Sequence, residues 1–200
     1  MVTSMKRKSN ILRKTNETKI AISLNIDGAG KRKIDTPIGF LNHMLDLFAK
    51  HGLFDLTIKA RGDTHIDEHH TVEDIGIALG EAFSKALGKK IGIRRYGFFI
   101  LPMDETLATV ALDFSGRYAF QFNCLFLREK VGDLSTELVS HFWDSFAQNA
   151  KANLHIKVEN GGNEHHKIES IFKSAARAIR MAAEIDPKAK KEIPSTKGKL

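Results

Sequence analysis

Two copies of one short motif constrain this chain of 200 residues more than any other feature. The motif has the pattern E-H-H-x-x-E, and it occurs at residues 68–73 and again at residues 164–169. Each copy opens a run of apolar residues with helical spacing, so we expect each copy to begin an amphipathic helix. On such a helix the first histidine and the second glutamate share one face, and the second histidine points about 100° away. Each copy therefore offers side-chain ligands in two directions.

The segments that surround the motifs also repeat. Residues 17–28 align without a gap on residues 105–116, an offset of 88, whereas the histidine pairs are offset by 96. The second half has therefore gained about eight residues, which fit the stretch 123–134. Each half is expected to run strand, strand, helix, strand, helix. This internal duplication predicts an α+β fold in which two mainly antiparallel sheets pack around the helices, with a first half over residues 10–92, a second over 93–186 and a tail over 187–200.

Local patterns predict the individual elements. Apolar and polar residues alternate over residues 17–28, which is typical of a half-buried strand, and a shorter strand around 32–35 would pair with it as a hairpin. Residues 96–103 are expected to add a strand that opens the second half. Ser135 is placed to cap the helix that follows it. By composition alone, the lysine-rich tail is expected to be disordered.

Composition and charge exclude several classes of protein. The 42% hydrophobic content is enough to bury a core, and a single cysteine cannot form an internal disulfide. With no apolar run of membrane-spanning length and no signal-peptide pattern, the chain is expected to be cytoplasmic. The net charge is +7, but residues 1–14 carry five basic and no acidic groups, and residues 187–200 carry five basic groups and one acid. The remaining body is slightly acidic, which argues against a nucleic-acid partner.

The repeated histidines and glutamates predict a paired metal centre. Imidazole nitrogen and carboxylate oxygen suit divalent Mn, Fe, Co or Zn. A single copy of the motif would equally fit solvated residues that cap a helix start, but two copies in matching context favour ligands. His43 and His141 lie mid-helix at equivalent places, whereas His65 and His155 lack equivalents and are interpreted as structural. Pseudo-symmetry suggests two ligand sets, each taking one off-face histidine from the other motif: His69, Glu73, His141 and His166; and His43, His70, His165 and Glu169.

Further residues could complete an enzyme site. A carboxylate near the metals could act as a general base, with Glu17 one candidate and the pair Asp104 and Glu105 another. Several cationic or hydroxyl groups could bind a phosphate, although each taken singly is more often a solvated surface group: Arg95, Arg117, Lys173, Ser195 and Lys197. The chemistry of the residues alone therefore predicts a metalloenzyme of unknown reaction.

The two motifs, together with residues 13–18, 40–45 and 194–198, closely resemble the imidazoleglycerol-phosphate dehydratase family of histidine biosynthesis. The resemblance covers residues 10–198. It implies a hydro-lyase that converts imidazole-glycerol phosphate to imidazole-acetol phosphate at two manganese ions, for which the eight histidines and glutamates above match the ligands. It implies that Glu17 takes a proton from the glycerol chain, and that Arg95, Arg117, Lys173, Ser195 and Lys197 bind the phosphate, so that the tail belongs to the site. It also implies a homo-oligomer of 24 subunits with sites between subunits.

The chain departs from that family at two positions. Glu68 stands where an aspartate is expected, and Leu47 stands where many relatives carry a glutamine on the substrate side. Neither residue is an expected metal ligand. Two alternatives stay open at this point: a dinuclear metallohydrolase that acts on a phosphoester, and a non-catalytic metal-binding assembly protein. A third alternative, an α+β nucleic-acid-binding module with basic tails, is disfavoured by the slightly acidic body. The expected partners are a small phosphate substrate and further copies of the chain, with no nucleic acid and no membrane.

Overall fold

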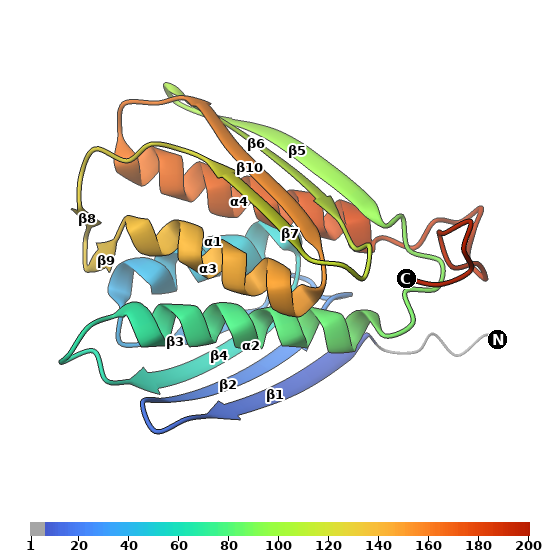
Figure 1. Cartoon of the computed structure of the whole chain (residues 1–200), viewed down its shortest axis with the longest axis horizontal. Coiled ribbons are helices and arrows are strands. Elements are labelled where there is room, and N and C mark those ends of the chain that lie inside the picture. Colours follow the sequence, from blue (N-terminus) through green and yellow to red (C-terminus); the bar gives the residue numbers. More distant parts are fainter. Residues whose placement is uncertain (1–6) are drawn as a thin grey trace.

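A computed structural model describes residues 7–200 of the chain. The expected basic segment 1–14 therefore lies partly outside the described residues. The chain runs through four long helices and ten strands over the described range (Figure 1). The first half contains β1 (Lys8–Lys14), β2 (Thr18–Asn25), β3 (Arg32–Asp35), α1 (Gly39–Gly52), β4 (Asp55–Gly62) and α2 (His69–Leu87). The second half contains β5 (Tyr96–Met103), β6 (Thr106–Asp113), β7 (Ala119–Asn123), β8 (Lys130–Val131), β9 (Leu134–Ser135), α3 (Glu137–Ala150), β10 (Asn153–Asn160) and α4 (Glu164–Ala183).

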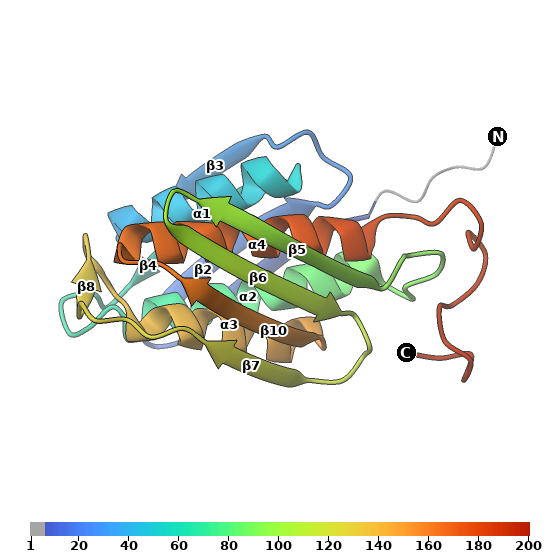
Figure 2. The ribbon, with the colours of Figure 1, turned by 90° about the horizontal axis from the view of Figure 1, so that it is seen from above.

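Two four-stranded sheets enclose the helices, which confirms the expected α+β architecture. The strand orders are β1-β2-β4-β3 and β5-β6-β10-β7, so the two halves repeat one topology. Figure 1 shows the four helices as a layer between the sheets, and Figure 2 shows the second sheet running across α3 and α4, on which it packs. The alternating residues of β2 and β6 bury one face against the helices, as their period of two requires. Both halves therefore contribute to one continuous core.

Two predictions about the first sheet were wrong or incomplete. The strand at Arg32–Asp35 does not form a hairpin with β2 but pairs in parallel with β4. The Asp55 carboxylate accepts hydrogen bonds from the backbone N–H groups of Ala29 (2.8 Å) and Lys31 (3.1 Å), so the loop after β2 crosses the start of β4 to reach its far side. The strand at Lys8–Lys14 was not anticipated. Its sequence is mostly polar, and its pairing with β2 comes from a sheet edge that local patterns do not reveal.

Close helix packing brings the two halves together. Helix α2 packs on α3, and α1 packs on α4. A Cβ atom added at Gly76 would lie 2.7 Å from the carbonyl oxygen of Phe142, and one at Gly80 would lie 2.5 Å from that of Phe146. These two glycines therefore allow the backbones of α2 and α3 to approach each other directly. The approach matters for the site, because α2 and α3 carry ligands from different halves.

The start of α3 and the tail also differ from expectation. Ser135 does not cap α3, which begins at Glu137 with Thr136 before it; the Ser135 hydroxyl instead donates a hydrogen bond to Glu68. Composition predicted a disordered tail, but the tail has local structure. It forms turns, and Arg95 donates from its guanidinium to the carbonyl oxygen of Pro194 at 2.8 Å. In the described part of the chain, none of the helices combines the length and apolar character needed to span a bilayer.

Candidate metal centre

One group of ligand atoms forms where α1 meets α4. The Nε2 atoms of His43 and His165 lie 3.3 Å and 3.0 Å from Oε2 of Glu169. His165 and Glu169 are one helical turn apart, as the motif predicted, whereas His43 comes from the other half of the chain. Their ligand atoms lie within 4.8 Å of one another. Glu169 is 9% exposed; burial would raise its pKa, but hydrogen bonds from Lys173 and His165 lower it. The carboxylate is thereby kept ionised and able to bind a cation.

The pseudo-equivalent group forms where α2 meets α3. His69 and Glu73 lie one turn apart on α2, and His141 comes from α3, with Nε2 at 3.4 Å from Oε1 of Glu73. The rings of His69 and His141 lie 4.5 Å apart between centroids. Nε2 of His141 is buried and has no hydrogen-bond partner in the described residues. A buried nitrogen lone pair left without a donor is the arrangement that a bound cation would satisfy. These donors fit the divalent metals expected from the sequence.

The second histidine of each motif points elsewhere. The ring planes of His69 and His70 are inclined by 76°, and those of His165 and His166 by 83°. Nδ1 of His70 lies 3.0 Å from Oδ2 of Asp63 and 3.9 Å from Oε2 of Glu17. This contact with Asp63 raises the pKa of His70. The expected set was His43, His70, His165 and Glu169. A single chain brings the other three together but holds His70 away from them.

His166 has equivalent surroundings in the second half. Nδ1 of His166 lies 2.9 Å from Oε2 of Glu105, and Nε2 lies 3.6 Å from Oδ2 of Asp104. The hydrogen bond to His166 and those from the backbone lower the pKa of Glu105 to about 2. These three residues form a third group of close ligand atoms. Of the two base candidates, Glu105 is thus fixed by its hydrogen bonds, whereas Glu17 is exposed beside His70.

The structure holds one site residue that the sequence did not suggest. Asp63 follows the turn glycine Gly62 at the end of β4, and its contact with His70 spans seven positions of a loop. The only signal in the sequence is a carboxylate that precedes a histidine motif by a few residues. Such a signal does not distinguish a hydrogen-bonding partner from a solvated turn residue.

The expected phosphate contacts lie mostly at the other end of the molecule. Arg95 pairs with Asp113 through both nitrogens of its fork, at 2.7 Å and 3.0 Å, and its backbone N–H donates to Ala182 in the last turn of α4. His165 lies in the first turn of that helix, 17 residues earlier, or about 25 Å away. Arg117 is exposed in the loop after β6, where a Cβ added at the preceding Gly116 would lie 2.5 Å from Leu200 at the end of the tail. Figure 1 shows the C-terminal tail at the end of the molecule opposite the starts of α2 and α4.

Lys173 is the exception among the expected phosphate contacts. It lies on α4 one turn after Glu169, and its Nζ atom is 2.5 Å from Oε1 of that glutamate. A single chain therefore places Lys173 with the ligand groups and the other four residues far from them. Leu47 is half-buried against the core, and His65 and His155 are exposed.

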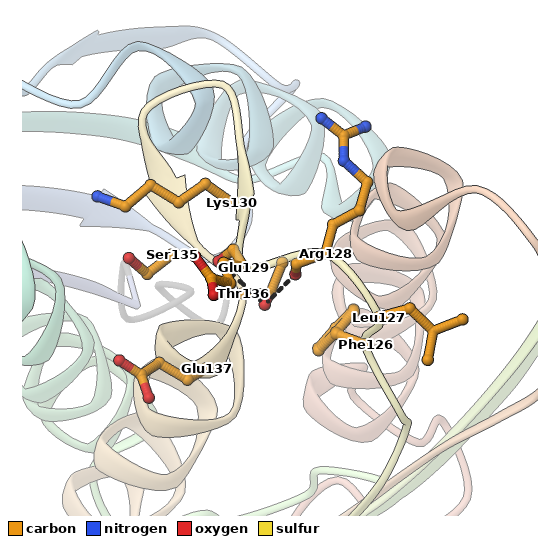
Figure 3. Close-up of a pocket in the computed structure, with 8 residues that line it drawn as sticks. All are labelled: Phe126, Leu127, Arg128, Glu129, Lys130, Ser135, Thr136 and Glu137. Atoms are coloured by element: carbon orange, nitrogen blue, oxygen red, sulfur yellow. Dashed lines mark hydrogen bonds between the residues drawn. The ribbon is translucent and has the colours of Figure 1, made fainter.

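The inserted segment of the second half shapes a cavity of about 460 Å³ beside α3 (Figure 3). Thr136 donates to the carbonyl oxygen of Arg128 there, at 2.7 Å. On the side toward α2, Glu68 accepts hydrogen bonds from Lys130 Nζ at 3.0 Å and from the backbone N–H of Ser135 at 3.1 Å. Glu68 is one of the two departures from the resembled family and directly precedes His69. Its hydrogen bonds thereby connect the inserted segment to the start of α2.

The fold and its two histidine and glutamate groups define an internally duplicated α+β protein with paired metal-ligand sites. A family model for imidazoleglycerol-phosphate dehydratase matches residues 36–179, more than half of the chain. The imidazoleglycerol-phosphate dehydratase of Rhodopirellula baltica is 58% identical over 194 residues, which cover 97% of this chain and 96% of that protein. The enzyme of Methylorubrum populi is 54% identical over 97% of this chain and all of its own length. The chain therefore belongs to the imidazoleglycerol-phosphate dehydratase family, whose members are hydro-lyases of histidine biosynthesis.

Solved structures agree with that assignment. The crystal structure of imidazoleglycerol-phosphate dehydratase from Staphylococcus aureus has a TM-score of 0.81 and 41% identity, and covers 90% of this chain and 99% of its own. The Pyrococcus furiosus structure, in complex with (S)-C348, has a TM-score of 0.82 and 33% identity, and covers 95% of this chain and all of its own. Together with the sequence relatives, they confirm that the chain is an enzyme with this α+β fold.

Proposed function

We propose that this chain dehydrates imidazole-glycerol phosphate to imidazole-acetol phosphate at a centre of two manganese ions. The family supports the dehydration itself, in histidine biosynthesis. One observation carries the proposal further: each of two groups holds three ligands, and the second histidine of each motif turns away from the group of its own motif. Each group is one protein ligand short of the set expected from the sequence.

In this proposal a second copy of the chain supplies the missing ligand. His70 adjoins His69, and His166 adjoins His165, so one contact between the α2 start of one copy and the α4 start of another can complete both groups. His70 then joins His43, His165 and Glu169 of the neighbour, and His166 joins the other group. Because the contact joins different surfaces, each copy makes it twice, and such contacts close into rings or larger symmetric shells. That geometry supports a homo-oligomer, for which the resemblance implies 24 subunits.

The phosphate contacts support the same arrangement. Arg95 lies about 25 Å from His165 of its own chain, a separation set by the length of α4. The loop that carries Arg117 and the tail that carries Ser195 and Lys197 lie at the same end of the molecule as Arg95. A small phosphate compound cannot span that distance. We therefore assign these residues, and with them the tail, to a site whose metal ligands belong to other copies. Arginine is suited to this role because its fork binds phosphate oxygens in pairs.

Glu17 is the proposed base. Its carboxylate is exposed and lies 3.9 Å from Nδ1 of His70, so it faces the place where two copies would meet. The two three-ligand groups would hold the two cations, whose positive charge would stabilise the negative charge that develops on the substrate imidazole. Glu17 takes a proton from a carbon of the glycerol chain, and the C–O bond to the hydroxyl group on the neighbouring carbon breaks. That hydroxyl group leaves as water with the proton that Glu17 removed, and the resulting enol tautomerises to the ketone. The phosphate is retained throughout and serves to orient the substrate.

The test strips the protein with a chelator and reloads it with Mn²⁺. Turnover of imidazole-glycerol phosphate to a ketone and the particle size in sedimentation are followed together. The proposal expects both to return with the metal. Release of inorganic phosphate would instead indicate the metallohydrolase, and a restored assembly without turnover would indicate a non-catalytic metal-binding assembly protein. Either result would overturn the proposed function.

A further inference from the structure

Each off-face histidine has a carboxylate at its Nδ1 atom. Asp63 lies 3.0 Å from His70, and Glu105 lies 2.9 Å from His166. A carboxylate in this position accepts the Nδ1 proton, fixes the ring orientation and leaves the Nε2 lone pair for a metal. The two contacts have similar lengths, yet the two carboxylates occupy unrelated positions in the duplicated sequence.

The repeat explains the difference. Gly62 pairs with Thr18 in the first sheet, and a Cβ added at Gly161 would meet Thr106, the repeat equivalent of Thr18. The two glycines therefore correspond, and the residue after each should correspond as well. In the first half that residue is Asp63, whereas in the second half it is Gly162, which has no carboxylate to offer.

In the second half, Glu105 supplies the carboxylate that Gly162 lacks. Its Oε1 atom accepts hydrogen bonds from the backbone N–H groups of Gly162 (3.2 Å) and Asn163 (2.9 Å), and its Oε2 atom faces His166. The repeat equivalent of Glu105 is Glu17. With Asp63 already on His70, Glu17 stays 3.9 Å from the ring and 53% exposed.

We infer that Asp63 and Glu105 are positioning residues for the two off-face histidines, and that the change from aspartate at 63 to glycine at 162 decides which duplicated glutamate is free to act as the base. The inference rests on the proposed function, because it takes His70 and His166 as metal ligands. It explains from geometry why two glutamates at equivalent positions have different tasks. It also assigns a role to Asp63, which makes no contact with either three-ligand group in the described chain.

The first test measures Mn²⁺ affinity by titration calorimetry and particle size by sedimentation. Asp63→Asn and Glu105→Gln are each expected to weaken Mn²⁺ binding about 10–100-fold, the range found when such supporting carboxylates are lost. Asp104→Asn serves as the comparison, since Asp104 is 75% exposed and lies on the Nε2 side of His166. It is expected to change the affinity less than twofold. An equal loss in Asp104→Asn and Glu105→Gln would show that these residues bind a cation themselves, and would overturn the inference.

The second test uses the repeat to restore function. An added Cβ at Gly162 meets nothing within 4 Å, so Gly162→Asp can be accommodated. When Gly162→Asp is added to Glu105→Ala, most of the lost Mn²⁺ affinity is expected to return. If Glu105 only stabilised the fold, a carboxylate at position 162 would not restore this affinity. No recovery by the double variant would refute the equivalence of positions 63 and 162. If His70→Ala retained full metal content, the proposed function would fail; if it lost metal and Asp63→Asn did not, only this inference would fail.

Discussion

Glu68 links the inserted segment of the second half to the start of α2, and its replacement by glutamine has a calculable effect. Burial alone would raise the pKa of Glu68, but the hydrogen bonds from Ser135 and Lys130 lower it to about 2. The side chain is only 13% exposed, so solvent screens these contacts weakly. Glutamine keeps the shape and one acceptor oxygen but loses the charge. Because a hydrogen bond to a charged group contributes about 1.5–3 kcal/mol, we expect Glu68→Gln to lower the free energy of unfolding by about 2 kcal/mol.

The measurement is urea unfolding of the chelator-stripped protein. Trp143 is the single tryptophan, lies fully buried on α3 and reports the transition by its fluorescence. For a domain of this size the same change should lower Tm by roughly 4–8 °C. Glu129→Gln, an exposed glutamate on the same segment, is the matched control and should change the free energy by less than about 0.5 kcal/mol.

A double-mutant cycle with Ser135→Ala isolates the contact. We expect the effects of Glu68→Gln and Ser135→Ala to be non-additive by about 1 kcal/mol, since each removes part of the same hydrogen-bonding unit. Strict additivity, or a loss in Glu68→Gln no larger than that of the Glu129 control, would refute the role assigned to Glu68.

Three further predictions concern the site, the core and a buried charge. His70→Ala should reduce bound Mn²⁺ to about half of the wild-type content, because only one of two paired groups loses a ligand; metal analysis showing full content would contradict this. Gly80→Ala should cost about 1–2 kcal/mol, as the clash with the Phe146 carbonyl outweighs the gain in helix propensity, whereas Gly162→Ala, in open space, should cost little in the same urea assay. Lys90 is 7% exposed, and burial lowers its pKa in the folded protein below the value of 10.5 expected in the unfolded chain. Between the folded and unfolded pKa values the unfolded chain binds more protons, so the free energy of unfolding should rise with pH across that window. Lys90→Met should abolish this rise; an unchanged slope would exclude Lys90 as its origin.

The parts of the fold that local patterns control were predictable. The helix-face pairs His69 with Glu73 and His165 with Glu169 follow from a spacing of four residues, and the structure brings each pair together with the mid-helix histidine of the other half. The duplication supplied that last step, because His43 and His141 lie at equivalent positions of the two halves. The opening strand Tyr96–Met103 was predictable from its continuous apolar run.

Features that depend on contacts between distant residues were not predictable. The parallel pairing of β3 with β4 depends on Asp55 holding the preceding loop, and β1 depends on an edge of β2 that only the folded sheet presents. The contact between Asp63 and His70 depends on how an irregular loop returns to α2. The sequence alone also could not show that His70 and His166 would be held away from the groups they were expected to complete.

Mixing two inactive variants tests the shared site most directly. Glu17→Gln removes the proposed base on the α2 side, and His165→Ala removes a ligand on the α4 side. The two proteins are stripped of metal, mixed in equal amounts and reassembled with Mn²⁺, and each is also reassembled alone. If every site joins the α2 start of one copy to the α4 start of another, random mixing leaves about a quarter of the sites intact, and about a quarter of wild-type dehydration should appear. If the mixture stays as inactive as the separate variants although mixed assemblies form, each site lies within one chain and the account is contradicted.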